Sequence, residues 1–172
     1  LTQRAFLDED AIVRQNIVKY HMYLRVPLSP LTMEKLLQDS DRGVLLAALD
    51  RISMNASQPR VISEIERLSS HEDRGIRLKI VDVARDCNRY DSRYRSILRS
   101  MTEDKDAEVT SMAAVELARF GEKINSAVIE RIKNYLLSSK GCLLYTSDAA
   151  AEERGGGGGG GGWGGGGGGG GG

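Results

Sequence analysis

A pattern of about 33 residues recurs three times in this chain of 172 residues, and it restricts the possible folds more than any other feature. Each copy opens on an Asp that is followed three residues later by Val, Ile or another β-branched residue, at Asp41, Asp73 and Asp106. Apolar residues then recur at every fourth position, which places them on one face of a helix. These residues are Val44, Ala48 and Ile52; Ile76, Ile80 and Ala84; and Val109, Ala113 and Leu117.

A second helix is predicted later in each copy from apolar residues at positions i, i+4 and i+7. They are Val61, Ile65 and Leu68; Tyr94, Leu98 and Met101; and Val128, Ile132 and Tyr135. Turn-forming residues at 57–59 and 88–92 separate the paired helices. Each opening Asp is suited to cap the first turn of its helix, and Gly121 stands where a helix should end.

A degenerate copy is predicted before the first complete one. Ser29 and Pro30 form a cap and a first-turn proline, and they predict a short helix with Met33, Leu36 and Leu37 on one side. Upstream, residues 8–25 predict a longer amphipathic helix with a stripe of Val13, Ile17, Tyr20 and Leu24. This helix is either the first helix of the degenerate copy or a linker to another segment.

The third copy, residues 106–121, resembles the HEAT-like repeats of bacterial proteins through Asp106, Val109, Ala113, Leu117 and Gly121. The resemblance covers about residues 30–138 and implies an all-α fold, a right-handed α-solenoid of antiparallel helix pairs. The first two copies lack the closing Gly, and the Arg that such repeats carry after the β-branched residue is found only as Arg77. Armadillo and tetratricopeptide arrays are the alternatives, although the Trp and Gly-Tyr signature of the latter is missing.

The C-terminal segment has a different composition. Residues 155–172 are glycine apart from Trp163, and residues 142–150 resemble the translation of an adaptor used in sequencing libraries. A run without side chains cannot bury apolar area to offset its chain entropy, so we expect a disordered, non-native tail over 142–172. We therefore divide the chain into an N-terminal helix (1–28), a repeat domain (29–141, with helix pairs starting near 41, 73 and 106) and this tail, and expect an internal fragment of a longer protein.

Charge and hydropathy exclude several classes of protein. Without the tail the chain has 23 basic and 21 acidic side chains, a net charge of +2, which argues against a general binder of nucleic acids or membrane surfaces. No run of apolar residues is long enough to span a bilayer. Cys87 is the only cysteine outside the tail, which favours a reducing compartment, and we expect a cytoplasmic protein or one tethered to a membrane by a segment not included here.

Residues suited to catalysis or metal binding are few. His21, His71 and Cys87 lie far apart in the sequence and show no metal-ligand spacing. Residues 103–106 include three acidic side chains but lack the regular oxygen ligands of a calcium loop, and helix capping accounts for them. We expect no catalytic residue, no cofactor and no metal site.

The remaining candidate is a protein-binding surface on the second helix of the middle copy. That helix carries Arg93, Arg95 and Arg99 with no acid between them, and Tyr90 and Tyr94 are the aromatic residues nearest to them. In HEAT-like arrays the second helices line the concave side, where partners dock, so the resemblance implies a docking site for an acidic or phosphate-bearing partner. A solvated helix face accounts for the same arginines more simply.

We therefore predict a non-catalytic scaffold that binds a protein partner on the concave face of the second helices. The alternatives are a HEAT-like enzyme, similar to the bilin lyases or to the DNA glycosylases, and a membrane-tethered adaptor. A glycosylase requires concave aromatic residues and a long basic stripe. Here Glu66 and Lys133 stand at the positions equivalent to Arg99, so we expect no nucleic-acid partner.

The predicted register is tested by Ile80→Asp, which places a charge in the middle of the expected core. Burial of one Leu or Ile contributes roughly 1.5–3 kcal/mol, and a buried unpaired carboxylate adds a larger penalty. We expect this variant to unfold the chain. Urea denaturation monitored by circular dichroism would refute the register if the variant were as stable as the wild type.

Overall fold

The computed structural model describes residues 3–24 and 28–138, and all regular secondary structure within these ranges is helical. The predicted all-α class is therefore confirmed. In chain order the elements are η1 (Gln3–Leu7), α1 (Ala11–Leu24), α2 (Pro30–Leu37), α3 (Arg42–Leu49), η2 (Ile52–Asn55), α4 (Pro59–Leu68), α5 (Arg74–Cys87), α6 (Arg93–Met101) and α7 (Ala107–Arg119). Residues 126–138 are also helical.

The chain divides into two compact units, Leu1–Lys133 and Asn134–Gly172. This boundary lies inside the helix at 126–138, whereas the sequence predicted a boundary near residue 141. The predicted tail, residues 142–172, lies outside the described residues. In the second unit Leu136 and Leu137 are exposed, and the description below concerns the first unit.

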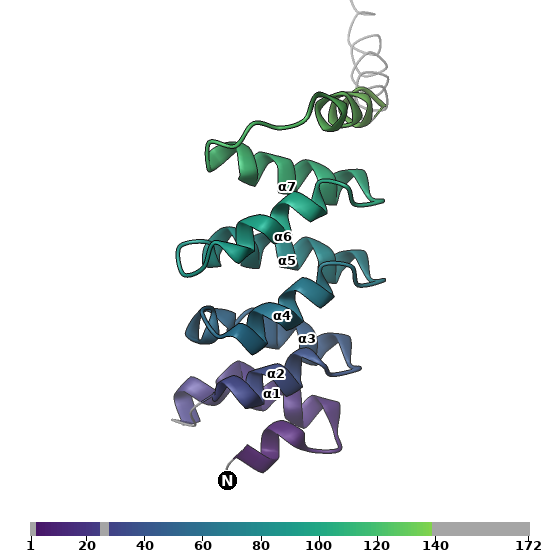
Figure 1. Ribbon diagram of the computed structural model, residues 1–172. Helices are drawn as coiled ribbons and strands as arrows, with labels where there is room; N and C mark the ends of the chain where they lie inside the picture. Colours follow the sequence, from purple (N-terminus) through teal and green to yellow (C-terminus); the bar gives the residue numbers. More distant parts are fainter. Residues whose placement is uncertain (1–2, 25–27, 139–172) are drawn as a thin grey trace, which may run out of the picture. The chain divides into compact units, whose positions relative to one another are not determined.

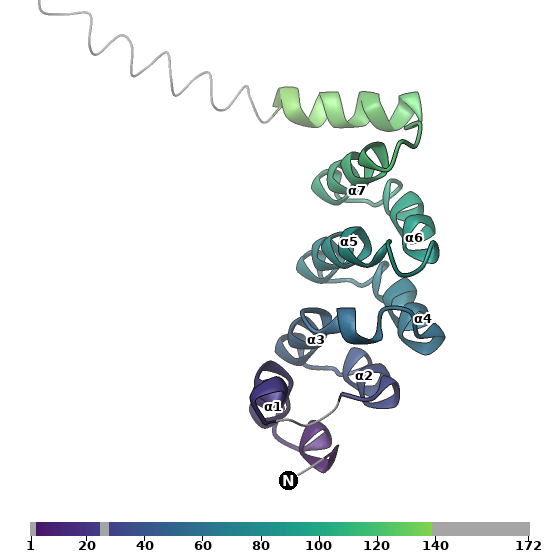
Figure 2. The same ribbon diagram turned by 90° about the vertical axis from the view of Figure 1, so that its left-hand side faces the viewer.

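The helices of the first unit lie in two rows. In one row α1 packs against α3, α3 against α5, and α5 against α7; in the other, α2 packs against α4 and α4 against α6. Consecutive helices also pack across the rows, as in α2 with α3, α5 with α6, and α6 with α7. Figure 2 shows α1, α3, α5 and α7 on one side and α2, α4 and α6 on the other, and Figure 1 shows their order along the stack. We call these the first row and the second row.

The core between the rows consists of the apolar stripes that the sequence predicts. Ile76, Ile80 and Ala84 of α5 are fully buried, and so are the corresponding residues of α3, α4, α6 and α7. One boundary differs, because α3 ends at Leu49 and Ile52 begins the short helix η2. Ile52 is nevertheless buried, since the tighter turn keeps its side chain on the core side.

Of the predicted stripe of α1, Ile17 packs against the core, but the buried face of this helix extends to residues outside the stripe. Tyr20 is more than half exposed, whereas Val18 and His21 are buried and Arg14 is largely covered. The core-facing stripe of α1 therefore includes two polar side chains, which an apolar periodicity does not detect. The packing of α1 on α3 matches that of α3 on α5, so α1 occupies the place of a first-row helix.

Aspartates begin the first-row helices, as predicted. The side chains of Asp41, Asp73 and Asp106 accept hydrogen bonds from the backbone amides of Val44, Ile76 and Val109, and thereby satisfy donors that have no partner inside the helix. Asp10 does the same for the amide of Ile12 at the start of α1. At the other end of α7, Gly121 has φ of +78°, a left-handed conformation that favours glycine.

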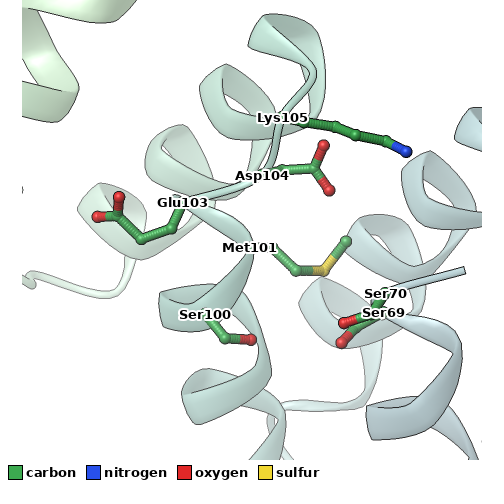
Figure 3. Close-up of a pocket in the computed structure, with 7 residues that line it drawn as sticks. All are labelled: Ser69, Ser70, Ser100, Met101, Glu103, Asp104 and Lys105. Atoms are coloured by element: carbon green, nitrogen blue, oxygen red, sulfur yellow. The ribbon is translucent and has the colours of Figure 1, made fainter.

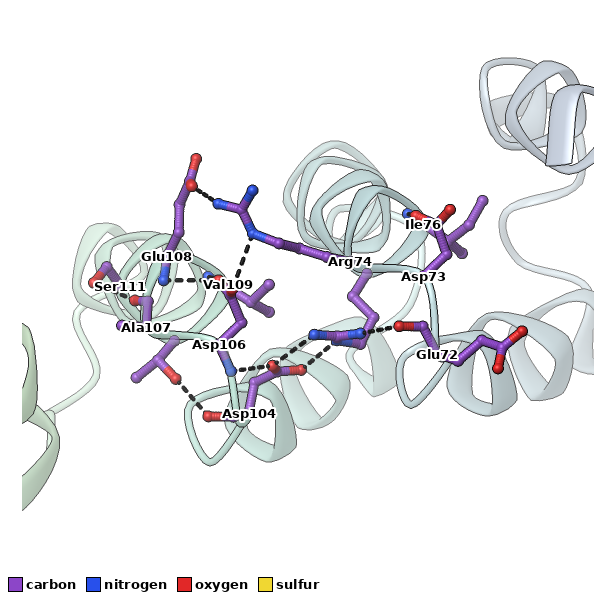
Figure 4. Close-up of polar contacts among 12 residues, drawn as sticks. Glu72, Asp73, Arg74, Ile76, Asp104, Asp106, Ala107, Glu108, Val109 and Ser111 are labelled. Atoms are coloured by element: carbon purple, nitrogen blue, oxygen red, sulfur yellow. Dashed lines mark hydrogen bonds and ion pairs between the residues drawn. The ribbon is translucent and has the colours of Figure 1, made fainter.

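Two arginines, Arg77, which is buried, and Arg14, which is largely covered, connect successive first-row helices. The Nε and Nη2 groups of Arg77 donate to the carboxylate of Asp104, and its Nη1 group donates to the carbonyls of His71 and Glu72. The side chains of Arg77 and Asp104 are only 3% and 8% exposed. Asp104 also accepts a hydrogen bond from the amide of Asp106, the cap of α7 (Figure 4). One guanidinium therefore fixes the loops before α5 and before α7.

Arg14 makes the same set of contacts at the start of the chain. It donates to Asp39 through two nitrogens and to the carbonyls of Asp8 and Glu9 through the third, and Asp39 accepts the amide of Asp41. Burial disfavours the charged form of Asp39, but the hydrogen bonds from Arg14 and from the Asp41 amide outweigh it and lower the pKa of this carboxyl. The sequence pattern missed Arg14 because its helix precedes the three clear copies.

In the copy that opens on Asp41, both members of the buried pair are replaced. Leu45 stands at the position of Arg77, and His71 stands at the position of Asp104. His71 keeps one contact that the aspartate makes. Its Nδ1 atom accepts a hydrogen bond from the amide of Asp73 at 3.0 Å. Since that nitrogen is an acceptor, the ring proton of neutral His71 lies on Nε2.

The buried pair leads to a double-mutant prediction. Loss of one partner leaves the other charge buried and unpaired, so Arg77→Leu and Asp104→His should each lower the free energy of unfolding by about 3–5 kcal/mol at pH 8. The double variant copies Leu45 and His71 and should lose much less than the sum of the two. Urea denaturation of the four proteins measures the coupling.

A matched control is Arg42→Leu, which breaks the pair between Arg42 and Asp73, with side chains 60% and 31% exposed. Because solvent screens this pair, the loss should be about 1 kcal/mol or less. Additive losses for Arg77→Leu and Asp104→His would show that the two side chains act independently.

Candidate interaction surface

The predicted interaction residues lie on and just before α6, and the structure brings only some of them to the surface. Arg93 and Arg99 are exposed, Arg95 is partly exposed, and Tyr90 in the loop before α6 is 46% exposed. The guanidinium of Arg89 lies over the ring of Tyr90 at 4.8 Å, which is a cation–π distance. The exposed part of the predicted surface therefore comprises three arginines of α6 and this Arg89–Tyr90 pair.

Tyr94 was wrongly predicted as a surface residue. Its side chain is fully buried, and its hydroxyl donates a hydrogen bond to the carbonyl of Ala56 at 2.9 Å. Burial raises the pKa of the Tyr94 hydroxyl above its usual range. Tyr94 is buried because it lies in the same stripe as Leu98 and Met101, which turns its ring toward the core.

Acidic residues from outside α6 neutralise its arginines. Arg99 donates through two nitrogens to Glu122 at 2.6 and 2.7 Å, and Arg93 donates to Asp91. Arg95 lies over the ring of Phe120 at 5.4 Å and donates to the side chain of Asn88. The sequence shows no acid between these arginines, but Asp91 precedes the helix and Glu122 follows the next one. The cluster is therefore not a free cationic patch.

Polar contacts also run between successive helices of the second row. Arg60 of α4 pairs with Glu34 of α2, and Gln38 donates to Glu64 at 2.6 Å. Arg67 pairs with Glu64 and donates to the backbone carbonyl of Leu37 at 2.8 Å. These contacts order long side chains that would otherwise sample many rotamers in solvent.

A pocket of about 280 Å³ lies at the C-terminal ends of α4 and α6. Three serines, Met101 and the loop before α7 line it, as Figure 3 shows. The lining residues are Ser69, Ser70, Ser100, Met101, Glu103, Asp104 and Lys105. The sequence singles out the charged residues 103–106, which helix capping accounts for, but it does not predict that they meet the end of α4.

The residues most suited to chemistry are held in structural roles. Cys87 is buried, and burial, with a smaller contribution from Asp86, raises the pKa of its thiol to about 11. A thiol with that pKa is uncharged at neutral pH and is a poor nucleophile. His21 is buried with Nδ1 at 2.9 Å from the carbonyl of Val18, and its Nε2 has no hydrogen-bond partner.

Among residues 3–24 and 28–138, no three His, Cys, Asp or Glu side chains are gathered so that they could hold a metal ion. None of the described helices is both long enough and apolar enough to cross a membrane. Comparison of the chain with protein-family models, with curated proteins and with solved structures gave no match.

The Asp91–Arg93 contact leads to a prediction about ionisation. The side-chain hydrogen bond from Arg93, assisted by the Arg93 amide, lowers the pKa of Asp91 to about 2. In Arg93→Gln the charged donor is lost while the amide remains, so the pKa of Asp91 should rise toward the ordinary value of roughly 3.9 without reaching it. Carboxyl-detected NMR titration measures this value, and an unchanged pKa would contradict the role of the guanidinium.

Proposed function

We propose that the chain is part of a right-handed α-solenoid of HEAT-like repeats. Three observations support this proposal: the helices lie in two rows, an aspartate begins each first-row helix, and buried Arg–Asp pairs connect successive units. Because a helix pair buries its apolar flank only against its neighbours, stacking supplies the core that one pair lacks.

We further propose that the chain is a non-catalytic scaffold that docks a protein partner on the second-row face. The carrying observation is the set of polar contacts that fix the exposed side chains of this face, through Glu34, Gln38, Arg60, Glu64, Arg67, Arg99 and Glu122. Immobilised side chains lose less conformational entropy on association, so a pre-ordered face favours binding. The proposed location is the cytoplasm, and the proposal includes no cofactor.

The structure favours the scaffold over the enzymatic alternatives. A glycosylase-like site needs aromatic residues and free cations facing one groove. Here Tyr94 is buried, and Arg93 and Arg99 are paired with acids of the same chain. Cys87, the one described cysteine, is held as an uncharged buried thiol.

A photo-crosslinking residue at Ser96 tests the proposed docking face, because Ser96 is an exposed residue of α6 in the second row. The matched control is the same residue at Val115, which is exposed on α7 in the first row. In cells of the source organism, we expect a discrete crosslinked protein from position 96 and none from position 115. Arg95→Glu with Arg99→Glu should reduce the yield several-fold, since the double change removes the pair between Arg99 and Glu122 and makes this face acidic.

A nucleic-acid function gives a different result. Salt-sensitive DNA binding by the purified chain, lost in the same double variant, would replace the scaffold proposal with a nucleic-acid one. Equal crosslinking from positions 96 and 115 would show that the second-row face is not the docking site.

A further inference from the structure

The pocket lies at the junction where the C-terminal ends of α4 and α6 meet. At the junctions before and after this one, an arginine donates to a backbone carbonyl of the preceding segment. At the α2–α4 junction, Arg67 donates to the carbonyl of Leu37, the last residue of α2. At the junction after α6, Arg131 donates to the carbonyl of Asp104 in the loop that follows α6. In both places a guanidinium from the following helix donates to a carbonyl at or after the end of the preceding helix. The two arginines stand at different positions: in the register of Val61, Tyr94 and Val128, Arg67 corresponds to Ser100 and Arg131 to Ile97.

At the α4–α6 junction neither of the corresponding residues of α6 is an arginine. Arg67 is the next-to-last residue of α4, and the next-to-last residue of α6 is Ser100. Ser100 lines the pocket together with Ser69 and Ser70, which follow the end of α4. The pocket of about 280 Å³ is therefore the space that a long side chain at position 100 would enter.

The hydroxyl groups that line the pocket are arranged to accept hydrogen bonds. Ser69 Oγ donates its hydrogen to the carbonyl of Glu66 at 2.7 Å, and Ser100 Oγ donates to the carbonyl of Ile97 at 2.8 Å. A hydroxyl has a single hydrogen, so both oxygens offer only lone pairs to a ligand. Such a lining requires a ligand that donates several hydrogen bonds.

Electrostatics also favour a cation. The C-terminal ends of α4 and α6 meet at the pocket, and helix C-termini carry partial negative charge. Asp104 adds a carboxylate, although Arg77 already binds it. Lys105 is the opposing charge; it is exposed, and Figure 3 shows its ammonium group at the upper edge of the pocket, away from Ser100.

We propose that this pocket binds the guanidinium group of an arginine side chain supplied by a partner polypeptide, in place of the arginine that the α4–α6 junction lacks. Guanidinium is planar, always charged and carries five N–H donors, which suits a lining of serine oxygens and helix C-termini. The pocket is slightly smaller than pockets for drug-sized ligands, which are roughly 300–1,000 Å³, so its volume suits a single side chain. The inference rests on the proposed scaffold function only in that the arginine belongs to a protein partner.

The test uses the whole chain and a small probe, the blocked tripeptide acetyl-Gly-Arg-Gly-amide. Its binding is followed by the NMR shifts of Ser69, Ser70 and Ser100. We expect saturable shifts at these three amides with a Kd in the millimolar range, as is usual for one side chain, on the order of −4 kcal/mol. The same peptide with citrulline, which has the shape of arginine but no charge, should shift them much less.

Three variants distinguish the proposal from general charge effects. Ser100→Arg supplies the missing side chain, so it should abolish probe binding and raise the Tm by roughly 2–6 °C. Lys105→Gln removes the opposing cation and should tighten binding about two- to fivefold. The matched control Ser96→Arg adds the same charge to an exposed position of α6 and should leave saturation at the three serines unchanged.

Weaker binding in Lys105→Gln would mean that the pocket prefers anions and would overturn the proposal. Shifts that persist in Ser100→Arg, or that citrulline reproduces, would overturn it as well. If Ser100→Arg fails to fold, the Lys105→Gln and citrulline measurements still decide the question. A failure here is distinct from a failure of the scaffold proposal, because crosslinking from position 96 does not depend on this pocket.

Discussion

The buried pair of Arg77 and Asp104 is the interaction on which the arrangement of successive helix pairs depends. A guanidinium and a carboxylate that are nearly inaccessible to solvent are tolerated only when their hydrogen bonds are satisfied. Arg77 meets this condition by binding Asp104 together with two carbonyls of the loop before α5. Asp104 in turn holds the amide of the residue that caps α7. The pair therefore specifies where one helix begins relative to another about 30 residues away, which apolar packing alone does not fix.

Much of the fold could be predicted from the sequence because its physical causes are local. The apolar spacing predicts the buried stripes of α3 to α7, and the aspartate at each start predicts the caps that the structure shows. Helix α1 was harder, because its buried face includes Arg14 and His21 in place of apolar residues. Hydrophobic periodicity carries no information about a polar side chain that is buried by pairing.

The interaction surface was less predictable, since it depends on residues that approach only after folding. Asp91 and Glu122 neutralise arginines of α6 from the flanking segments, so a charge run within one helix overstates the field that a partner meets. Tyr94 shows another error, because its nearness to the arginines in the sequence suggested a surface role while its place in the apolar stripe dictated burial. The pocket beside Ser100 depends on the meeting of two helix ends, which no spacing within one copy encodes.

The replacement of the buried pair by Leu45 and His71 has a consequence for recombination of such chains. Both members of a pair lie within one copy, Arg77 and Asp104 in the copy that opens on Asp73, and Leu45 and His71 in the copy that opens on Asp41. A copy that is moved as a whole therefore keeps its guanidinium with its carboxylate. A crossover inside a copy, between the two positions, would join a charged residue to a neutral partner and bury an orphan charge. Such crossovers are tolerated only between copies of the same kind, charged with charged or neutral with neutral.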